Sequence, residues 1–161
     1  MSKALVIIKS MGIGDLCILI SNIHAISKKI EKKVTVLAHK NTRASEILKN
    51  DPHVEEVIEL TENEIKGFIN IIKIIRSKNF TQSFIYSDSI RFYLIAKLSG
   101  IKENFHYKFF SKRGKNFFKT AKDFTEKTLK IKVDPQSKIY CDDNYIKDAK
   151  NKFGITEKTK N

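Results

Sequence analysis

The opening of the chain constrains the fold more than any other part of the sequence. Residues 4–8 form a continuous apolar run, which is followed by a short turn containing Gly12 and Gly14. Such a run is typical of a strand that is buried on both faces, as in a parallel sheet. From Leu16, apolar residues recur at steps of three and four, which predicts a helix to about Lys29. The chain therefore begins with a strand, a glycine-containing turn and a helix.

Strand and helix patterns continue to alternate as far as Leu98. Further strands are expected at residues 33–38, 54–60 and 80–86, and helices at 42–48, from Thr61 to about residue 75, and at 88–98. The buried faces of the last two helices are expected to include Ile69, Leu94 and Leu98. This alternation predicts an α/β fold, a Rossmann-like parallel sheet with right-handed crossovers and helices on both faces.

The pattern is less regular after residue 101. A fifth strand is expected at residues 104–107, and helices at 117–131 and 142–153. A chain of 161 residues is long enough for one ordinary domain. We therefore expect one Rossmann-like domain over residues 1–153 and a polar tail over residues 154–161.

The charge favours anionic partners. The chain has 31 Lys and Arg against 18 Asp and Glu, a net charge of +13, and most of the excess lies after residue 101. The chain is also crowded with Ile and Asn, so a compositional bias that yields a solvated basic surface is the alternative explanation. A nucleic-acid partner is not expected, because no nucleic-acid-binding motif accompanies the charge.

Location and metal content follow from what the sequence lacks. No apolar run approaches the roughly 18 residues that a membrane span needs, and the apolar start meets a charge at Lys9, which is too early for a signal peptide. We therefore expect a cytoplasmic protein. Cys17 and Cys141 lie far apart, and the four His residues share no ligand spacing, so no metal is expected.

The turn after the first strand is the strongest candidate for a ligand site. Glycines at Gly12 and Gly14 let the backbone approach a ligand, and free amides at a helix start face an anion. A dinucleotide fingerprint would need a third small residue where Cys17 stands, and no P-loop is present. Asp15 has two interpretations that the residues leave open. It is either a helix N-cap or a general base at the carboxyl edge of the sheet.

Four stretches of the sequence, in this order and spacing, resemble the family 9 glycosyltransferases, the ADP-heptose:lipopolysaccharide heptosyltransferases. They are LVIIKSMGIGDL at 5–16, DPHVEEVI at 51–58, IRSKNFTQSFI at 75–85 and LIAKLSGI at 94–101. The resemblance implies the N-terminal half of a GT-B glycosyltransferase, which grips the acceptor. It also implies that the half that binds the nucleotide sugar is missing, so that this truncated chain is inactive alone.

The resemblance gives roles to residues that follow the first and fourth strands. Asp15 would be the catalytic base of an inverting transfer from a nucleotide sugar such as ADP-heptose to the lipopolysaccharide inner core. No cofactor or metal is implied beyond this donor, which is a co-substrate. The implied substrate-binding residues are Lys9, Ser10, Gly12, Gly14, Ser89 and Arg91.

The resemblance also implies a place of action and leaves an alternative function. A lipopolysaccharide acceptor places the protein in the cytoplasm or peripherally at the inner face of the inner membrane, against anionic lipid. The basic, aromatic segment at 108–118 is either a membrane-facing loop or a set of core aromatics with exposed lysines. The alternative function is a non-catalytic binding module for an anionic sugar or glycolipid.

Overall fold

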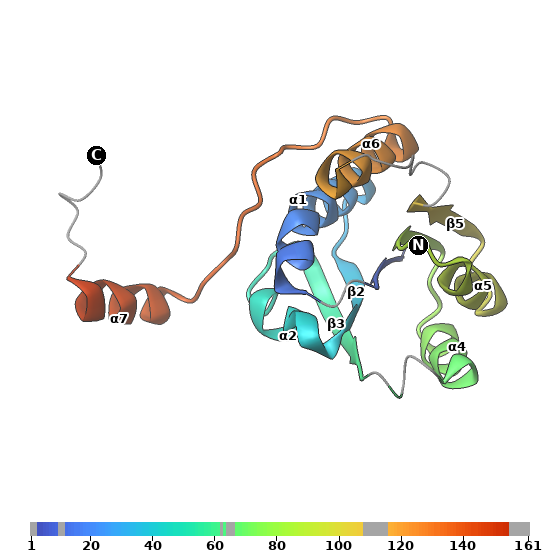
Figure 1. Ribbon diagram of the computed structural model, residues 1–161, viewed down its shortest axis with the longest axis horizontal. Coiled ribbons are helices and arrows are strands. Elements are labelled where there is room, and N and C mark those ends of the chain that lie inside the picture. The colour runs from blue at the N-terminus through green and yellow to red at the C-terminus, as the bar shows by residue number, and fades with distance from the viewer. Residues whose placement is uncertain (1–2, 10–11, 62, 64–66, 108–115, 155–161) are drawn as a thin grey trace.

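The computed structural model describes residues 3–9, 12–61, 63, 67–107 and 116–154 (Figure 1). Its strands are β1 (Ala4–Ile8), β2 (Val34–His39), β3 (Val54–Leu60), β4 (Gln82–Tyr86) and β5 (Glu103–His106). Its helices are α1 (Ile13–Ile30), α2 (Ala44–Ile47), α4 (Phe68–Ser77), α5 (Ile90–Leu98), α6 (Phe117–Leu129) and α7 (Asp143–Phe153), with a short 3-10 helix at Lys40–Thr42. The predicted strands and helices are confirmed within a few residues, except for the helix expected from Thr61: α4 begins at Phe68, and residues 62 and 64–66 lie outside the described residues.

The strands form one parallel sheet with the order β3-β2-β1-β4-β5. The central strand β1 pairs with β2 through Ile8 and Ala38 and with β4 through Ile8 and Tyr86. Every residue of β1 is buried, which explains the uninterrupted apolar run at the start of the chain. The strand order changes direction between β1 and β4.

Helices cover both faces of the sheet, as the alternation predicts (Figure 1). Val6 and Ile8 belong to the core that includes residues of α1 and α6, whereas Leu5 and Ile7 belong to the core that includes residues of α4 and α5. Successive residues of a strand point to opposite faces, so one apolar run supplies both cores.

The sequence prediction of inward-facing residues is wrong at three positions. Ile69 is 66% exposed, and Leu94 and Leu98 are 44% and 51% exposed. In α5 the buried side is formed instead by Phe92 and its neighbours Ile95 and Ala96. Because α5 is apolar around most of its circumference, periodicity could not identify the side that faces the sheet.

The C-terminal helices differ in how they attach to the sheet. In α6, Thr125 donates a hydrogen bond to Asn22 of α1 at 2.7 Å, and the hydroxyl groups of Thr125 and Tyr86 lie 2.6 Å apart. The helix α7 buries no residue and lies away from the sheet, beyond an extended segment (Figure 1). The predicted tail lies outside the described residues from position 155 onward.

None of the helices in the described part of the chain is long and apolar enough to cross a membrane.

Candidate functional site

The carboxyl ends of β1 and β4 form the candidate site. These strands are neighbours, and their last paired residues are Ile8 and Tyr86. After β1 the chain enters α1 on one face of the sheet, and after β4 it enters α5 on the other. Parallel α/β sheets bind ligands at such a reversal, outside the carboxyl ends of the strands.

The predicted site residues follow these two strands. Lys9 is exposed directly after β1, and Gly12, Gly14 and Asp15 begin α1. Ser89 and Arg91 begin α5 after β4. Ser10 lies outside the described residues. Segments far apart in sequence thus meet at one edge of the sheet.

Asp15 lies in the first turn of α1 but does not cap it. The N-cap is Gly12, whose carbonyl oxygen accepts the Leu16 amide hydrogen bond at 3.4 Å. Asp15 is half-buried, and no other described residue forms a hydrogen bond or an ion pair with its carboxylate. The N-cap interpretation of Asp15 is therefore wrong, and its carboxylate is available to a ligand at the end of β1.

The glycines of this turn are not needed for an unusual backbone conformation. Gly12 has φ of −113° and ψ of 147°, which any residue can adopt. A Cβ atom added at Gly12 would lie 3.9 Å from Oδ2 of Asp15, and one at Gly14 would meet nothing within 4 Å. Both residues are exposed, so they leave the amides of the first turn open to an anion.

The second segment contributes a helix start and a carboxylate. Ser89 is the N-cap residue of α5, and its amide donates a hydrogen bond to Oγ of Ser87 at 3.1 Å. Arg91 is half-buried in the first turn. Burial raises the pKa of Tyr107, at the end of β5, and the negative charge of nearby Asp88 raises this pKa further, against a hydrogen bond to Thr120.

His39, at the carboxyl end of β2, is a buried polar residue at this edge of the sheet that the sequence pattern did not single out. Its Nδ1 accepts a hydrogen bond from the Asn41 amide at 3.0 Å, so a neutral ring carries its proton on Nε2. The side chain is 5% exposed, and Nε2 has no hydrogen-bond partner among the described residues. An unsatisfied buried donor is rare. No sequence signal indicates this unsatisfied donor, because a single His without ligand spacing shows no pattern.

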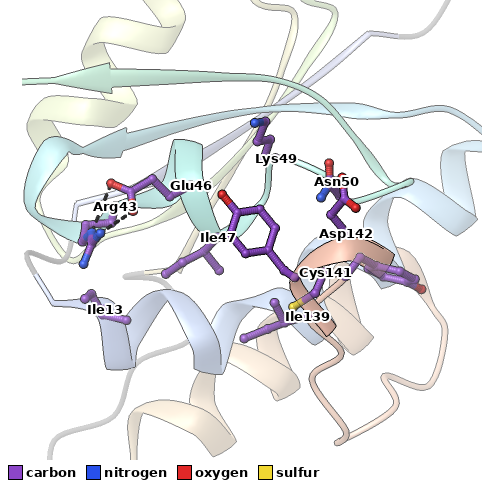
Figure 2. Close-up of a pocket in the computed structure, with 11 residues that line it drawn as sticks. Ile13, Arg43, Glu46, Ile47, Lys49, Asn50, Ile139, Cys141 and Asp142 are labelled. Atoms are coloured by element: carbon purple, nitrogen blue, oxygen red, sulfur yellow. Dashed lines mark hydrogen bonds and ion pairs between the residues drawn. The ribbon is translucent and has the colours of Figure 1, made fainter. Parts of the chain in front are cut away.

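A pocket of about 580 Å³ opens beside the start of α1 (Figure 2). Its apolar lining includes Ile13 of α1, Ile47 of α2 and Ile139 of the C-terminal segment, and its polar lining includes Arg43 and Lys49. Its size is typical of a small-ligand site. Ile13 and Asp15 both lie in the first turn of α1 but on different sides of the helix, so the pocket lies near the candidate site without including Asp15.

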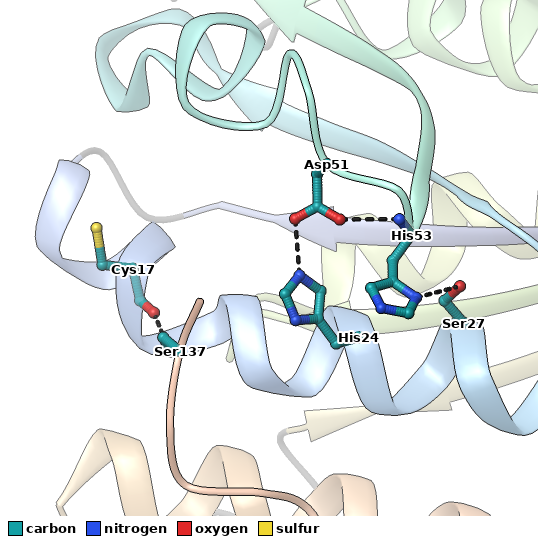
Figure 3. Close-up of polar contacts among 6 residues, drawn as sticks. All are labelled: Cys17, His24, Ser27, Asp51, His53 and Ser137. Carbon is teal, nitrogen blue, oxygen red and sulfur yellow. Dashed lines mark hydrogen bonds and ion pairs between the residues drawn. The ribbon is translucent and has the colours of Figure 1, made fainter. Parts of the chain in front are cut away.

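A second polar cluster lies at the amino edge of the sheet (Figure 3). Nε2 of His24 lies 2.7 Å from Oδ2 of Asp51, and the other carboxylate oxygen accepts the His53 amide at 2.9 Å. Nδ1 of His53 lies 3.2 Å from Oγ of Ser27. No three His, Cys, Asp or Glu side chains in the described ranges are arranged to hold a metal ion. This cluster joins α1 to the turn before β3.

The cluster predicts a pH dependence of stability. Burial lowers the pKa of His53, and the nearby charges of His24 and Lys28 lower it further, against the opposing effect of Asp51. A pKa below its value in the unfolded chain, about 6.5, favours the folded state above that pH, and this contribution is lost as the pH falls through the folded pKa. Urea unfolding from pH 7.5 to 5 should show wild type losing stability relative to His53→Asn. Parallel curves would contradict this assignment.

Solved glycosyltransferase structures have the same fold as this chain. A glycosyl transferase of family 9 from Veillonella parvula matches with a TM-score of 0.70 and 13% sequence identity, over 97% of this chain and 50% of that one. The ADP-heptose lps heptosyltransferase II of E. coli matches with a TM-score of 0.61 and 14% identity, over 96% and 51% of the two chains. For E. coli heptosyltransferase WaaC with ADP the values are 0.60 and 11%, over 83% and 49%.

The chain has the fold of these glycosyltransferases. The fold expected from the resemblance is thereby confirmed, and the chain spans about half the length of each of these structures. No protein-family model matches the sequence, and no curated protein matches it in sequence.

Proposed function

We propose that this chain is the acceptor-binding half of an inverting glycosyltransferase of the heptosyltransferase kind. Residues 1–153 would form the acceptor-side domain, and residues 154–161 would lead to a domain that binds the nucleotide sugar. The observation that carries the proposal is the position of Asp15. Its carboxylate stands at the reversal point of a glycosyltransferase fold, without a capping role and without a partner among the described residues.

In this proposal Asp15 is the general base of a single displacement. Its carboxylate accepts the proton of an acceptor hydroxyl group while the hydroxyl oxygen bonds to the anomeric carbon of the donor sugar. The bond between that carbon and the diphosphate oxygen breaks, and ADP leaves with the electron pair. The configuration at the anomeric carbon is thereby inverted. No metal is required for the step assigned to this half.

The acceptor would lie between the pocket and the ends of β1 and β4. Lys9 and Ser10 would bind a carboxylate or phosphate of the lipopolysaccharide inner core, Gly12 and Gly14 would shape the site, and Ser89 and Arg91 would line its other side. The apolar lining of the pocket suits a sugar ring, and its charged residues are of both signs, Arg43 and Lys49 beside Glu46 and Asp142, with Arg43 paired to Glu46. With such an acceptor the protein would act in the cytoplasm or peripherally at the inner face of the inner membrane.

Isothermal titration of the purified chain tests the proposal. A delipidated inner-core acceptor is expected to bind, and ADP-heptose is not, because the groups that hold the diphosphate would lie in the other half. Tight donor binding would overturn the division of roles between the halves. Absence of acceptor binding at low salt would overturn the acceptor site itself.

A non-catalytic binding module is the alternative to be separated from this proposal. Both functions predict acceptor binding, so binding alone does not distinguish them. Only a transferase forms a glycosylated acceptor once a donor-binding domain is supplied. Acceptor binding with no product under that condition would favour the binding module.

A further inference from the structure

The helix α5 has an apolar face that nothing in the described part of the chain covers. Its inner side packs against the sheet through Phe92 and Ile95. Its outer side carries Ile90, Leu94 and Leu98, which are 46%, 44% and 51% exposed. Residues spaced by four lie on one side of a helix, so these three form a stripe. A helix that is apolar on all sides is normally buried on all sides.

The stripe continues onto the neighbouring helix. Nη2 of Arg76 in α4 donates a hydrogen bond to the Leu98 carbonyl oxygen of α5 at 2.6 Å, which fixes the two helices side by side. Ile69 of α4 is 66% exposed, opposite the side of α4 that buries Ile71. We call the outer surface of these two helices the α4–α5 face. Its exposed apolar and cationic residues are Ile69, Lys73, Arg76, Ile90, Leu94, Lys97 and Leu98.

The charge of this face has one sign. Lys73, Arg76 and Lys97 are exposed there, and neither α4 nor α5 contains an Asp or a Glu. The other helices of the described chain differ, since α1, α2, α6 and α7 each contain at least one acidic residue. Exposed apolar side chains among cationic ones are typical of a surface that rests on anionic lipid.

We propose that the α4–α5 face binds the surface of an anionic lipid bilayer. The apolar side chains enter the boundary between headgroups and acyl chains, while the Lys and Arg side chains extend to the lipid phosphates. A second copy of this chain suits the face less well, because it would bring the same positive charges together. The inference rests on the proposed function only for the place of action at a membrane, and not on the transfer reaction, since Asp15 and the pocket beside α1 take no part in it.

Sedimentation of the full chain with lipid vesicles tests the proposal. The chain should bind vesicles of phosphatidylcholine mixed with phosphatidylglycerol, more weakly as salt rises, and should bind pure phosphatidylcholine much less. Lys97→Gln should weaken binding about fivefold, because each Lys near an anionic surface contributes about 1 kcal/mol. Lys29→Gln removes the same charge from an exposed position at the end of α1, on the other face of the sheet, and should weaken binding less than about twofold.

Leu94→Gln tests the apolar part of the face and should weaken vesicle binding by roughly tenfold. Leu94 is already half-exposed, and circular dichroism would show that the variant stays folded. Equal losses for Lys29→Gln and Lys97→Gln would mean attraction by net charge alone and would overturn the proposal. Vesicle binding that Leu94→Gln leaves unchanged would also overturn the proposal. Absence of vesicle binding, with a dimer by light scattering that Leu94→Gln abolishes, would assign the face to a second copy instead.

The outcomes of these vesicle experiments are separable from the proposed function. The vesicle assay contains no acceptor sugar, and the acceptor titration contains no lipid bilayer. Failure of the vesicle experiment therefore does not contradict acceptor binding, and failure of acceptor binding does not contradict the α4–α5 face.

Discussion

Replacing Asp15 by Asn is expected to lower sugar transfer by a factor of roughly 10²–10⁴, the range that a positioned general base contributes. The amide has the shape of the carboxylate but cannot accept the proton of an acceptor hydroxyl group. Because Asp15 does not cap α1 but lies in its first turn, loss of its charge should lower the free energy of unfolding by no more than about 1 kcal/mol. The measurement is the rate of product formation with this chain joined to the donor-binding half of a similar heptosyltransferase, alongside a urea unfolding curve.

Asp88→Asn is the matched control for Asp15→Asn. Asp88 is an exposed carboxylate at the end of β4, on the same edge of the sheet, and the substitution is chemically identical. Its transfer rate should remain within about threefold of wild type, because in the proposed mechanism it moves no proton. A large loss of transfer rate in Asp88→Asn, with a normal rate in Asp15→Asn, would assign the role of general base to the end of β4. Normal rates in both variants would remove general-base catalysis from this edge.

Phe124→Ala is expected to lower the free energy of unfolding by about 3–5 kcal/mol, as for other large buried aromatic residues. Phe124 lies in α6 and is 0% exposed. Its ring meets Tyr86 edge-on at a centroid distance of 5.2 Å and Tyr107 at 6.3 Å. Truncation leaves a cavity between α6 and the carboxyl ends of β4 and β5. Urea unfolding followed by circular dichroism measures the change.

Phe153→Ala is the same substitution at a position that should not matter. Phe153 ends α7 and is 70% exposed, so its truncation should change the free energy of unfolding by less than about 0.5 kcal/mol. If Phe124→Ala is as stable as wild type, α6 does not pack on the sheet as described. If Phe153→Ala is strongly destabilised, α7 is packed in solution.

Local sequence patterns predicted the elements and one edge of the sheet. The apolar run at residues 4–8, the glycine turn and the stripe after Leu16 specify a buried strand and a helix independently of the rest of the chain. Parallel strands place the residues after their carboxyl ends at the same edge, so the spatial proximity of the segments at Asp15 and Ser89 was predictable. The roles of these residues stay predictions, to be tested as described above.

The features that the sequence could not predict depend on which helix and strand surfaces pack against each other. The outward position of Leu94 and the unsatisfied Nε2 of His39 arise from the packing of α5 and from the end of β2. A pattern with a period of 3.6 identifies the apolar side of a helix only when the other side is polar, and in α5 apolar residues also lie on the outer side, around Lys97. The sequence by itself therefore determined the order of strands and helices and the candidate edge. The tertiary structure alone decided which apolar residues are buried, because burial depends on contacts between segments distant in the chain.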